Sequence, residues 1–266
     1  FSRNTSENQG VGGFSLASLA SESSSNQHEF RVTESMIINP KTVNETRFQF
    51  EYNDRRREGD NSIPTINVSS AFVGGGAQVG LSYTKSKRWE LQNYTTTSVG
   101  KDSQHALKFG LRVRGINIED RSESGYGGSF TFAGVPGLFS SIEQYRQKVL
   151  GNPDPIFNPT QFNITAGDPV ANVSQIDYSL FITDDWKARK DLTLSFGLRY
   201  ENQNNIKDSL NFAPRFGFAW QPGAGGARQP KTVIRGGIGM FYERFNENNT
   251  LTADRLDGVS QLRYTV

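Results

Sequence analysis

The chain has 266 residues, enough for one large β domain or two ordinary domains with a sizeable core. Its 29 basic and 27 acidic residues give a formal charge of +2, so charge does not indicate nucleic acid as a partner. The absence of cysteine excludes disulfides and thiolate metal sites, and the absence of a run of roughly 18 apolar residues excludes a transmembrane helix.

The N-terminal part of the chain mixes irregular and alternating stretches. Residues 1–10 lack a signal-peptide pattern, so we expect any export signal to lie upstream or to have been removed. Residues 15–27 are rich in serine and weakly patterned, which predicts a loop, and residues 53–64 are predicted as a second long link. Two stretches that alternate apolar with polar residues predict strands, at Phe48, Phe50 and Tyr52, and at Val79, Leu81 and Tyr83.

The middle of the chain contains the clearest alternation, in "HALKFGLRVRG". One predicted face carries Leu107, Phe109, Leu111 and Val113, and the other carries Lys108, Gly110, Arg112 and Arg114. Residues 119–172 then form the longest link, which we expect to be a loop insertion. Ser140 and Glu143 match a capping box, so one short helix is predicted inside it, whereas the prolines of "NPDPIFNP" exclude regular structure after that helix.

The C-terminal part alternates again in three stretches, 192–201, 211–220 and 232–245. Short links rich in turn formers, including "KARKD" and "QPGAGGARQPK", join them. Together with the earlier stretches they predict an all-β fold, an antiparallel meander of amphipathic strands.

Strand length and aromatic placement indicate which side of these strands meets lipid. The stretch from Phe212 to Trp220 suits the ~9 to 11 residues that a tilted strand needs to cross a bilayer, whereas soluble strands average about 5 to 6. Trp186 and Trp220 lie beside short turns, and Tyr200 and Tyr242 lie at the opposite strand ends, as in the two aromatic girdles of a membrane barrel. We therefore predict part of a large transmembrane β-barrel with long extracellular loops, closed because unpaired backbone groups are costly in hydrocarbon.

The opposite, polar face is predicted to line a hydrated interior, where arginine costs far less than in a dry core. The candidates for this face are Arg112, Arg114, Arg199, Arg215, Arg235 and Glu201. We expect these arginines to pair mainly with acids such as Glu201 and Glu243; contact with a plug or with an anionic solute is the alternative.

Three segments, "SLFITDDWKARKDLTLSFGLRYE", "NFAPRFGFAWQPG" and "KTVIRGGIGMFYERF", closely resemble the barrel region of Oar-like TonB-dependent receptors of the bacterial outer membrane. The segments "INVSSAF", "RWELQNYTT" and "HALKFGLRVRG" look like preceding strands in the same order, and the resemblance is densest from Arg88 to the C-terminus. It implies a barrel of roughly 22 strands around a plug domain, and transport of a large solute that is powered through TonB. It also implies substrate binding by the long outer loops and a place for Asp184, Asp185 and Trp186 at the periplasmic rim.

The chain departs from that family pattern, because we find no plug domain, TonB box, regulatory module, signal peptide or terminal aromatic residue. We expect residues 1–266 to be an internal portion of a barrel, with about half of its strands, and the missing strands to come from other sequence. Two long unpaired edges would otherwise remain.

No residue pattern indicates an enzyme, a cofactor or a metal site. His28 and His105 lie in separate predicted elements without a nearby nucleophile pattern, and Asp154 and Asp168 match no calcium-loop spacing. The glycines of "VGGGAQVG" are not followed by the Lys-Ser/Thr of a phosphate loop.

Three functions stay open at this stage: a transporter barrel, an outer-membrane barrel that displays adhesive or interaction loops without transport, and a soluble β-sandwich lectin or adhesin module. A plug and TonB box in the full gene would favour the first, and solubility without detergent would favour the third. The expected partners are outer-membrane lipid, the TonB complex and an unidentified solute.

Overall fold

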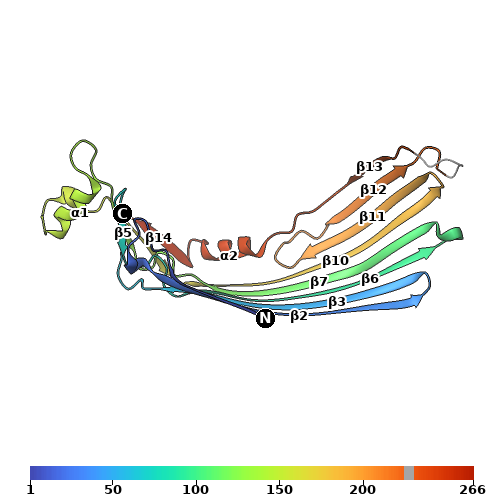
Figure 1. Cartoon of the computed structure of the whole chain (residues 1–266), viewed down its shortest axis with the longest axis horizontal. Coiled ribbons are helices and arrows are strands. Elements are labelled where there is room, and N and C mark those ends of the chain that lie inside the picture. Colours follow the sequence, from blue (N-terminus) through green and yellow to red (C-terminus); the bar gives the residue numbers. More distant parts are fainter. Residues whose placement is uncertain (225–230) are drawn as a thin grey trace.

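The computed structural model of the chain describes residues 1–224 and 231–266. Its larger sheet has nine strands in the order β1-β2-β3-β6-β7-β10-β11-β12-β13, and every neighbouring pair in it is antiparallel. The bounds are β1 Ser2–Gln9, β2 Ser21–Asn39, β3 Thr42–Gly59, β6 Ser82–Val99, β7 His105–Arg121, β10 Val170–Arg189, β11 Leu192–Gln203, β12 Phe212–Trp220 and β13 Ile234–Gly239. The long strands run side by side along the length of the molecule (Figure 1).

A second sheet lies at the end of the molecule away from the short turns, together with helix α1 (Figure 1). It has five strands in the order β14-β9-β8-β4-β5, in which β4 and β8 are parallel. The bounds are β4 Thr65–Val68, β5 Phe72–Gly75, β8 Ser129–Phe132, β9 Gln161–Gly167, β14 Gln261–Thr265, with helices α1 Ser141–Val149 and α2 Glu247–Arg255, and short 3-10 turns at Ala17–Leu19, Lys101–Ser103 and Pro155–Phe157. Among the described residues, neither helix is long and apolar enough to cross a membrane. We call this end of the molecule the loop end and the other the turn end.

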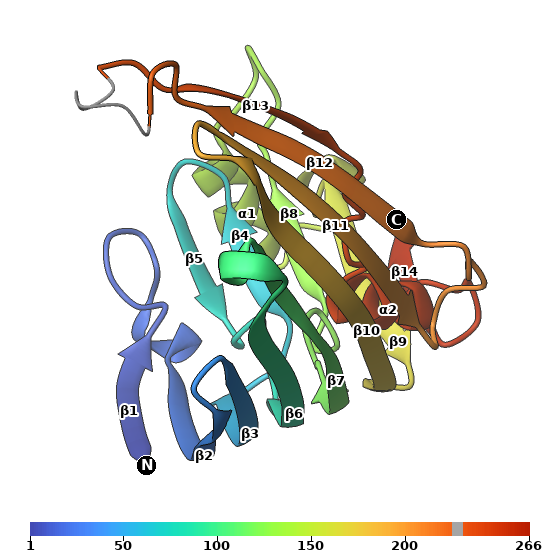
Figure 2. The same cartoon turned by 90° about the vertical axis from the view of Figure 1, so that its right-hand side faces the viewer.

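The prediction of an antiparallel β meander is confirmed; four strands of the second sheet are inserted between strands of the first, and β14 follows β13. Seen along the strands, the nine-stranded sheet is an arc that does not close on itself, and α2 lies on the inner side of that arc (Figure 2). Within the described residues, β1 and β13 are therefore the two edge strands of this sheet.

Turn chemistry explains the hairpins at the turn end. The β2–β3 connection contains Pro40, and the side-chain oxygen of Asn39 accepts a hydrogen bond of 2.9 Å from the backbone N–H of Lys41. Both features favour a tight turn. The β6–β7 connection begins at Gly100, whose φ of +84° is one that L side chains rarely adopt. The predicted turn "QPGAGGARQPK" falls largely on residues 225–230, outside the described residues.

Several predicted loops are wrong because the strands extend much further than the lipid-crossing length. Residues 21–27 belong to β2, and β3 continues to Gly59, so residues 21–27 of the serine-rich segment and residues 53–59 are strand and not loop, whereas residues 15–20 stay outside any strand. Strands β2, β3, β6, β7 and β10 have 17 to 20 residues each. Side chains on both faces of these extensions are largely polar, which removes the alternation that identifies a strand.

The predicted insertion 119–172 is shorter and more ordered than the sequence indicates. β7 runs to Arg121 and β10 starts at Val170, and between them lie β8, α1 and β9. The predicted helix is confirmed as α1, and Ser140 Oγ accepts the backbone N–H of Glu143 at 3.3 Å as its N-cap. Because two short strands pair in the second sheet, this segment is not the mostly irregular loop expected.

The nine-stranded sheet has an apolar outer face toward the turn end. Directly paired residues of antiparallel strands share a face, and the register places Phe50, Trp89, Leu91, Phe109, Leu111, Val113, Leu180, Ile182, Leu198 and Phe216 on the face away from α2. These side chains are exposed or half-buried; Leu180 keeps 54% of its surface exposed. A soluble sandwich would bury such a face under a second layer.

The principal buried cluster lies elsewhere, under α2 toward the loop end. Leu251 of α2 packs on Ile116 and Ile118 of β7 and on Ala171 and Val173 of β10. These four strand residues are on the inner face, so α2 covers the inside of the arc. The helix thereby fixes the chain that follows β13 against the inner surface.

Candidate functional site

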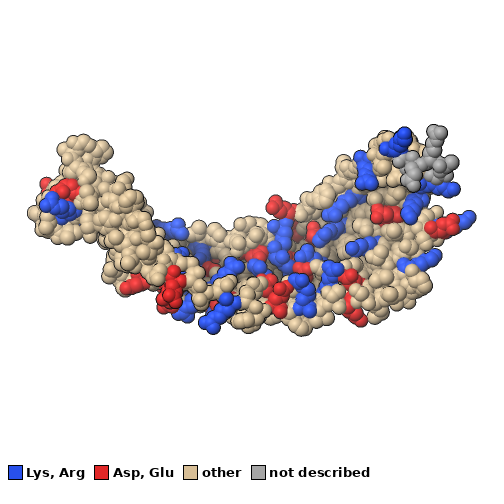
Figure 3. All heavy atoms as spheres, viewed as in Figure 1, with Lys and Arg blue, Asp and Glu red and all other residues tan. Residues whose placement is uncertain are grey.

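The inner face of the arc is charged over most of its length. The face drawn in Figure 3 shows lysine and arginine intermixed with aspartate and glutamate over the middle and right of the molecule. Register places the candidates Arg112 and Arg114 on this face, opposite Ser179 and Asp177 of β10. Arg199 and Glu201 follow on β11, opposite Phe181 and Ser179.

Arg215 and Arg235 lie on the same face but apart from this group. Arg215 pairs with Gly197 and Gly239, and its guanidinium lies 4.5 Å from the centre of the Phe241 ring. Arg235 is an exposed residue of the edge strand β13. The structure therefore brings together four of the six predicted inner-face residues, Arg112, Arg114, Arg199 and Glu201.

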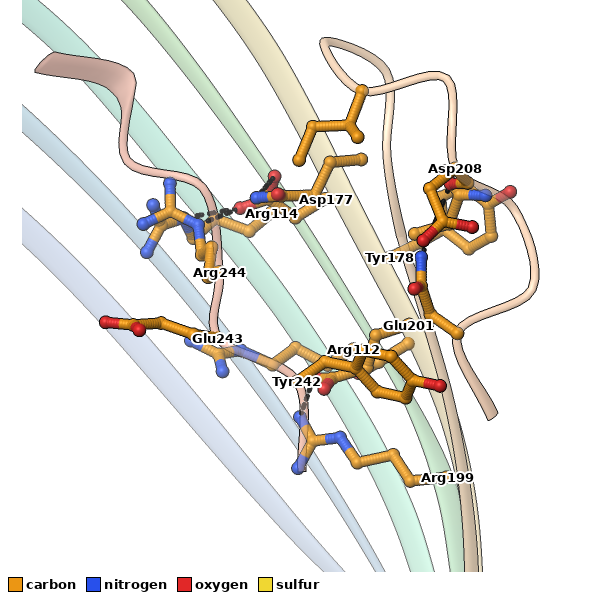
Figure 4. A pocket seen from close by; sticks show the side chains of 15 residues that line it. Arg112, Arg114, Asp177, Tyr178, Arg199, Glu201, Asp208, Tyr242, Glu243 and Arg244 are labelled. Carbon is orange, nitrogen blue, oxygen red and sulfur yellow. Dashed lines mark hydrogen bonds and ion pairs between the residues drawn. The ribbon is translucent and has the colours of Figure 1, made fainter. Parts of the chain in front are cut away.

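The chain after β13 turns back across this face and closes a pocket of about 230 Å³ (Figure 4). β7, β10 and β11, the link from β11 to β12, and residues 242–244 form its walls. Its charged residues balance in sign, with four cations and four anions: Arg112, Arg114, Arg199, Arg244, Asp177, Glu201, Asp208 and Glu243.

The returning segment is held by a network centred on two carboxylates. Arg244 places Nε 2.5 Å from Asp177 Oδ2 and Nη2 2.7 Å from Glu247 Oε2. Arg114 reaches the same two carboxylates at 3.4 and 3.6 Å, and Arg88 lies 3.4 Å from Glu247 Oε1. The Glu247 side chain is only 8% exposed, so three arginines compensate a carboxylate that has largely lost its water. We call these five residues the latch.

Two glutamines connect the latch to the main chain. Gln203 donates to Asp177 Oδ1 at 2.9 Å and accepts the backbone N–H of Phe245 at 3.0 Å. Gln175 also donates to Asp177 Oδ1, at 2.8 Å, and is almost fully buried. The segment is thus bonded to β10 and β11 through both side chains and backbone.

The remaining pocket arginines are neutralised on the wall itself. Arg112 lies 2.6 Å from Glu90 of β6, and Arg199 lies 2.8 Å from Glu201. The expected pairing with Glu201 is confirmed, whereas Glu243 forms no ion pair with any described residue. A surface of paired charges attracts water but presents little net charge to a passing solute.

On the outer face, aromatic residues mark two levels. Trp186 and Trp220 lie near the turn end, where Trp220 Nε1 donates to Asp191 at 3.1 Å and Trp186 stacks on His105 at 5.6 Å between ring centres. Tyr200 lies on the same face further toward the loop end, 6.1 Å from the ring of Tyr178.

The second level includes residues that the sequence analysis did not single out. Tyr178 is one, and Trp89 is another, whose ring covers Gly115 so closely that a Cβ there would be 2.3 Å from its Nε1. The eight steps from Tyr178 to Trp186 span about 27 Å along the strand, or about 20 Å across a membrane at a tilt of about 40°. That height approaches the ~25 Å apolar band of membrane barrels.

Tyr242 does not belong to this level, so that prediction is wrong. β13 ends at Gly239, and the ring of Tyr242 lines the inner pocket instead (Figure 4). The backbone N–H of Met240 still donates to Pro214 O at 2.9 Å, but proline has no N–H to return that bond. Pairing therefore stops there, although the alternation in the sequence continues.

The two histidines lie in separate elements, β2 and β7, as the sequence predicts. His28 lies beside Phe1 and Tyr52, and His105 Nδ1 is 2.7 Å from Asp184. Asp185 accepts a hydrogen bond from Ser195 at 2.5 Å. Within the described part of the chain, no group of three or more histidine, aspartate or glutamate side chains is arranged to hold a metal ion.

Comparison with known proteins identifies the fold family. The family model of the outer membrane beta barrel domain matches residues 1–211 and 203–264. Among solved structures, the chain is similar to the outer membrane transporter YddB from Escherichia coli, with 13% identity and a TM-score of 0.48 over 79% of this chain and 25% of that one. The chain therefore spans about a quarter of the length of that protein. No curated protein matches.

The family match covers nearly the whole chain and agrees with the geometry of the sheet. An apolar outer face with two aromatic levels, a charged inner face and an open arc of nine strands together describe part of a barrel wall. The chain belongs to the outer membrane beta-barrel domain family and forms part of a barrel in the bacterial outer membrane.

Proposed function

We propose that this chain is part of the wall of an Oar-like TonB-dependent transporter that moves a large solute across the outer membrane. The observation that carries the proposal is the width of the arc: nine adjacent strands do not close on themselves (Figure 2). Barrels of about 8 strands close around an interior filled by side chains, whereas barrels of about 16 to 22 strands enclose a channel or a plug.

The inner face supports passage of a hydrated solute. In its central part, Arg88, Arg112 and Arg114 are paired with carboxylates at 2.6 to 3.6 Å, which keeps the wall wet without giving it a strong field there. A large polar solute could move along such a surface without being held by it. The second sheet and α1 stand at the loop end, where they would meet the solute first.

The returning segment, residues 240–255, would narrow the lumen of a complete barrel. Residues 240–255 lie on the inner face and are held there by the latch and by Leu251. In a complete barrel this segment would occupy part of the lumen. We propose that it restricts the passage together with a plug, and that energy delivered through TonB displaces the plug.

Binding to TonB tests this proposal. The full-length protein, purified in detergent, should bind the periplasmic domain of TonB from the same organism, and deleting the TonB box from the full-length gene should abolish binding. A full-length protein with neither a plug nor measurable TonB binding would contradict energised transport.

A second function, display of interaction loops without transport, is favoured by one observation. Around α1, large apolar side chains at the loop end are exposed, including Leu138, Val149 and Leu150. Such residues on a protruding element are typical of contact surfaces. A display protein would function normally in a strain without TonB, whereas a transporter would not.

A further inference from the structure

Two arginines in the interior of the sheet, Arg55 and Arg57, differ from most inner-face arginines because they have no carboxylate partner among the described residues. Eight inner-face arginines lie within 4.0 Å of a carboxylate oxygen: Arg31, Arg47, Arg88, Arg112, Arg114, Arg199, Arg244 and Arg255. Arg55 and Arg57 form no ion pair with any residue that the structure describes. Both are exposed.

Their place in the sheet makes this difference informative. Arg215 and Arg235 also have no acidic partner among the described residues, but they lie on or beside the edge strand β13. Arg55 and Arg57 lie on β3, which is paired along its length with β2 on one side and β6 on the other. The residues paired with them on both neighbouring strands carry hydroxyl groups and no carboxylate.

Those hydroxyl groups surround the two guanidinium groups. Arg55 lies between Ser25 and Thr84 in the register, and Arg57 lies between Ser23 and Ser82. Ser21 accepts a hydrogen bond of 3.1 Å from Arg57 Nε, which fixes the direction of that side chain and leaves its outer nitrogens available.

Together these residues line a separate pocket of about 390 Å³, which we call the twin-arginine pocket. Its third inner-facing arginine is Arg255 of α2, and its inner-facing acid is Asp120, which Arg255 and Thr84 already satisfy. Arg56 and Arg121 also border this pocket, but the register turns both side chains to the outer face, where they pair with Glu58 and Glu123. Among the inner-facing side chains, three cations against one anion leave an excess of two positive charges, in contrast to the balanced pocket beside the latch.

We propose that the twin-arginine pocket binds a phosphate or sulfate group carried by a solute that enters from the loop end. Two planar guanidinium groups and several hydroxyls offer converging donors, which suit an anion with three or four oxygens better than a carboxylate with two. Arg55 and Arg57 lie on the loop-end side of Tyr52 and face the interior, so the pocket opens to solvent rather than to lipid. This site goes beyond the proposed transport function, because equilibrium binding requires neither TonB nor a plug.

Calorimetric titration of the full-length protein in detergent tests the site. Glucose 6-phosphate, inorganic phosphate and inorganic sulfate should bind, whereas uncharged glucose should not. A double variant, R55Q/R57Q, should bind each oxyanion more weakly by roughly 10-fold for each arginine removed, because charge-assisted hydrogen bonds to both are lost.

The matched control is Arg56→Gln. Arg56 lies between the two arginines on β3, points to the outer face and pairs with Glu58 at 2.7 Å, so this change removes the same charge from the same strand. It should leave affinity unchanged. If the double variant does not fold, Arg55→Gln and Arg57→Gln are measured singly.

Two results would overturn the proposal: no oxyanion binding to the full-length protein, or equal weakening by Arg56→Gln and by the double variant. The first would mean that acids elsewhere in the complete barrel neutralise the two arginines. The second would mean that only overall charge matters. Loss of TonB binding would leave this test intact, so the two proposals can fail separately.

Discussion

The turn-end and loop-end halves of the long strands place their apolar side chains on opposite faces of the same sheet. On β7, Leu107, Phe109, Leu111 and Val113 point to the outer face, whereas Ile116 and Ile118, nearer the loop end, point to the inner face. Leu111 keeps 37% of its surface exposed and Ile116 keeps 1%. β10 shows the same reversal, from Ile182 and Leu180 outside to Val173 and Ala171 inside.

We infer that this reversal marks the place where the wall leaves the membrane. On this inference, lipid surrounds the apolar side chains of the turn-end half, and no protein layer is needed to cover them. In the loop-end half, water replaces lipid outside, so the apolar side chains turn inward and pack under α2. A shift of the apolar positions by one residue, from the outer face to the inner face of a strand, therefore indicates where that strand crosses the membrane boundary.

The largest expected effect comes from charging the lipid face of the turn-end half. Leu198 lies opposite Ile182 near the middle of the apolar band, and Leu198→Arg should destabilise the folded barrel by about 2–4 kcal/mol. Leu194 pairs with Trp186 at the interface level, so Leu194→Arg should cost only about 0–1 kcal/mol. Equilibrium unfolding of the full-length protein in lipid vesicles measures both.

The control for this comparison is Ser195→Lys on the same strand. Ser195 points to the inner face and bonds Asp185, which can pair with the new ammonium group, so stability should change little. If Ser195→Lys costs as much as Leu198→Arg, the assignment of the two faces is wrong.

A second effect belongs to the loop-end half. Leu251→Ala removes the helix side chain that covers Ile116 and Val173 and should destabilise the attachment of α2 by about 2–3 kcal/mol, at the low end for buried leucine because the cluster is small. Hydrogen exchange of the α2 amides should accelerate accordingly, while exchange in β11 and β12 stays slow. Uniform acceleration in all strands would show that the two halves are not independent.

The alternation identified strands well in the half that lies in lipid and poorly in the other half. Phe48, Phe50 and Tyr52 indicate β3, but "NDRRREG" continues the same strand with polar residues on both faces. Outside the membrane each face of β3 meets water, so apolar and polar residues no longer alternate in this part of the sequence. Residues 21–27 of β2 were missed for the same reason.

The inner-face residues were predictable only where they lie on alternating strands. Arg112, Arg114, Arg199 and Glu201 follow from the polar face of β7 and β11. Asp177, Gln203, Arg244 and Glu247 do not, because the latch depends on a segment that turns back across the sheet, and Arg244 is 67 residues from Asp177. The one sequence feature that indicates this turn is Pro214, which has no N–H for further pairing with β13, so the pairing ends there and the chain turns to the inner face.

A smaller effect should come from the latch. Glu247→Gln leaves three arginines facing a neutral amide and should loosen the returning segment by about 1–2 kcal/mol, reduced from the cost of a fully buried pair because the arginines are partly exposed. Limited proteolysis between residues 240 and 255 reports the loosening. Glu243→Gln, in the same segment but without an ion pair among the described residues, should behave like the unmodified protein; equal sensitivity in both variants would argue against the latch.

The smallest effect concerns pH at the link from α2 to β14. Backbone N–H groups of Ser260 and Val259 donate to the Asp257 carboxylate and lower its pKa below the usual 3.8. Because the folded pKa is lowered, this contribution is complete above the unfolded pKa and disappears as pH falls through the folded one. Exchange of the β14 amides, corrected for its intrinsic pH dependence, should therefore rise below pH ~4. Asp257→Asn should remove that rise, and a rise that persists in the variant would assign it to other carboxylates of the second sheet.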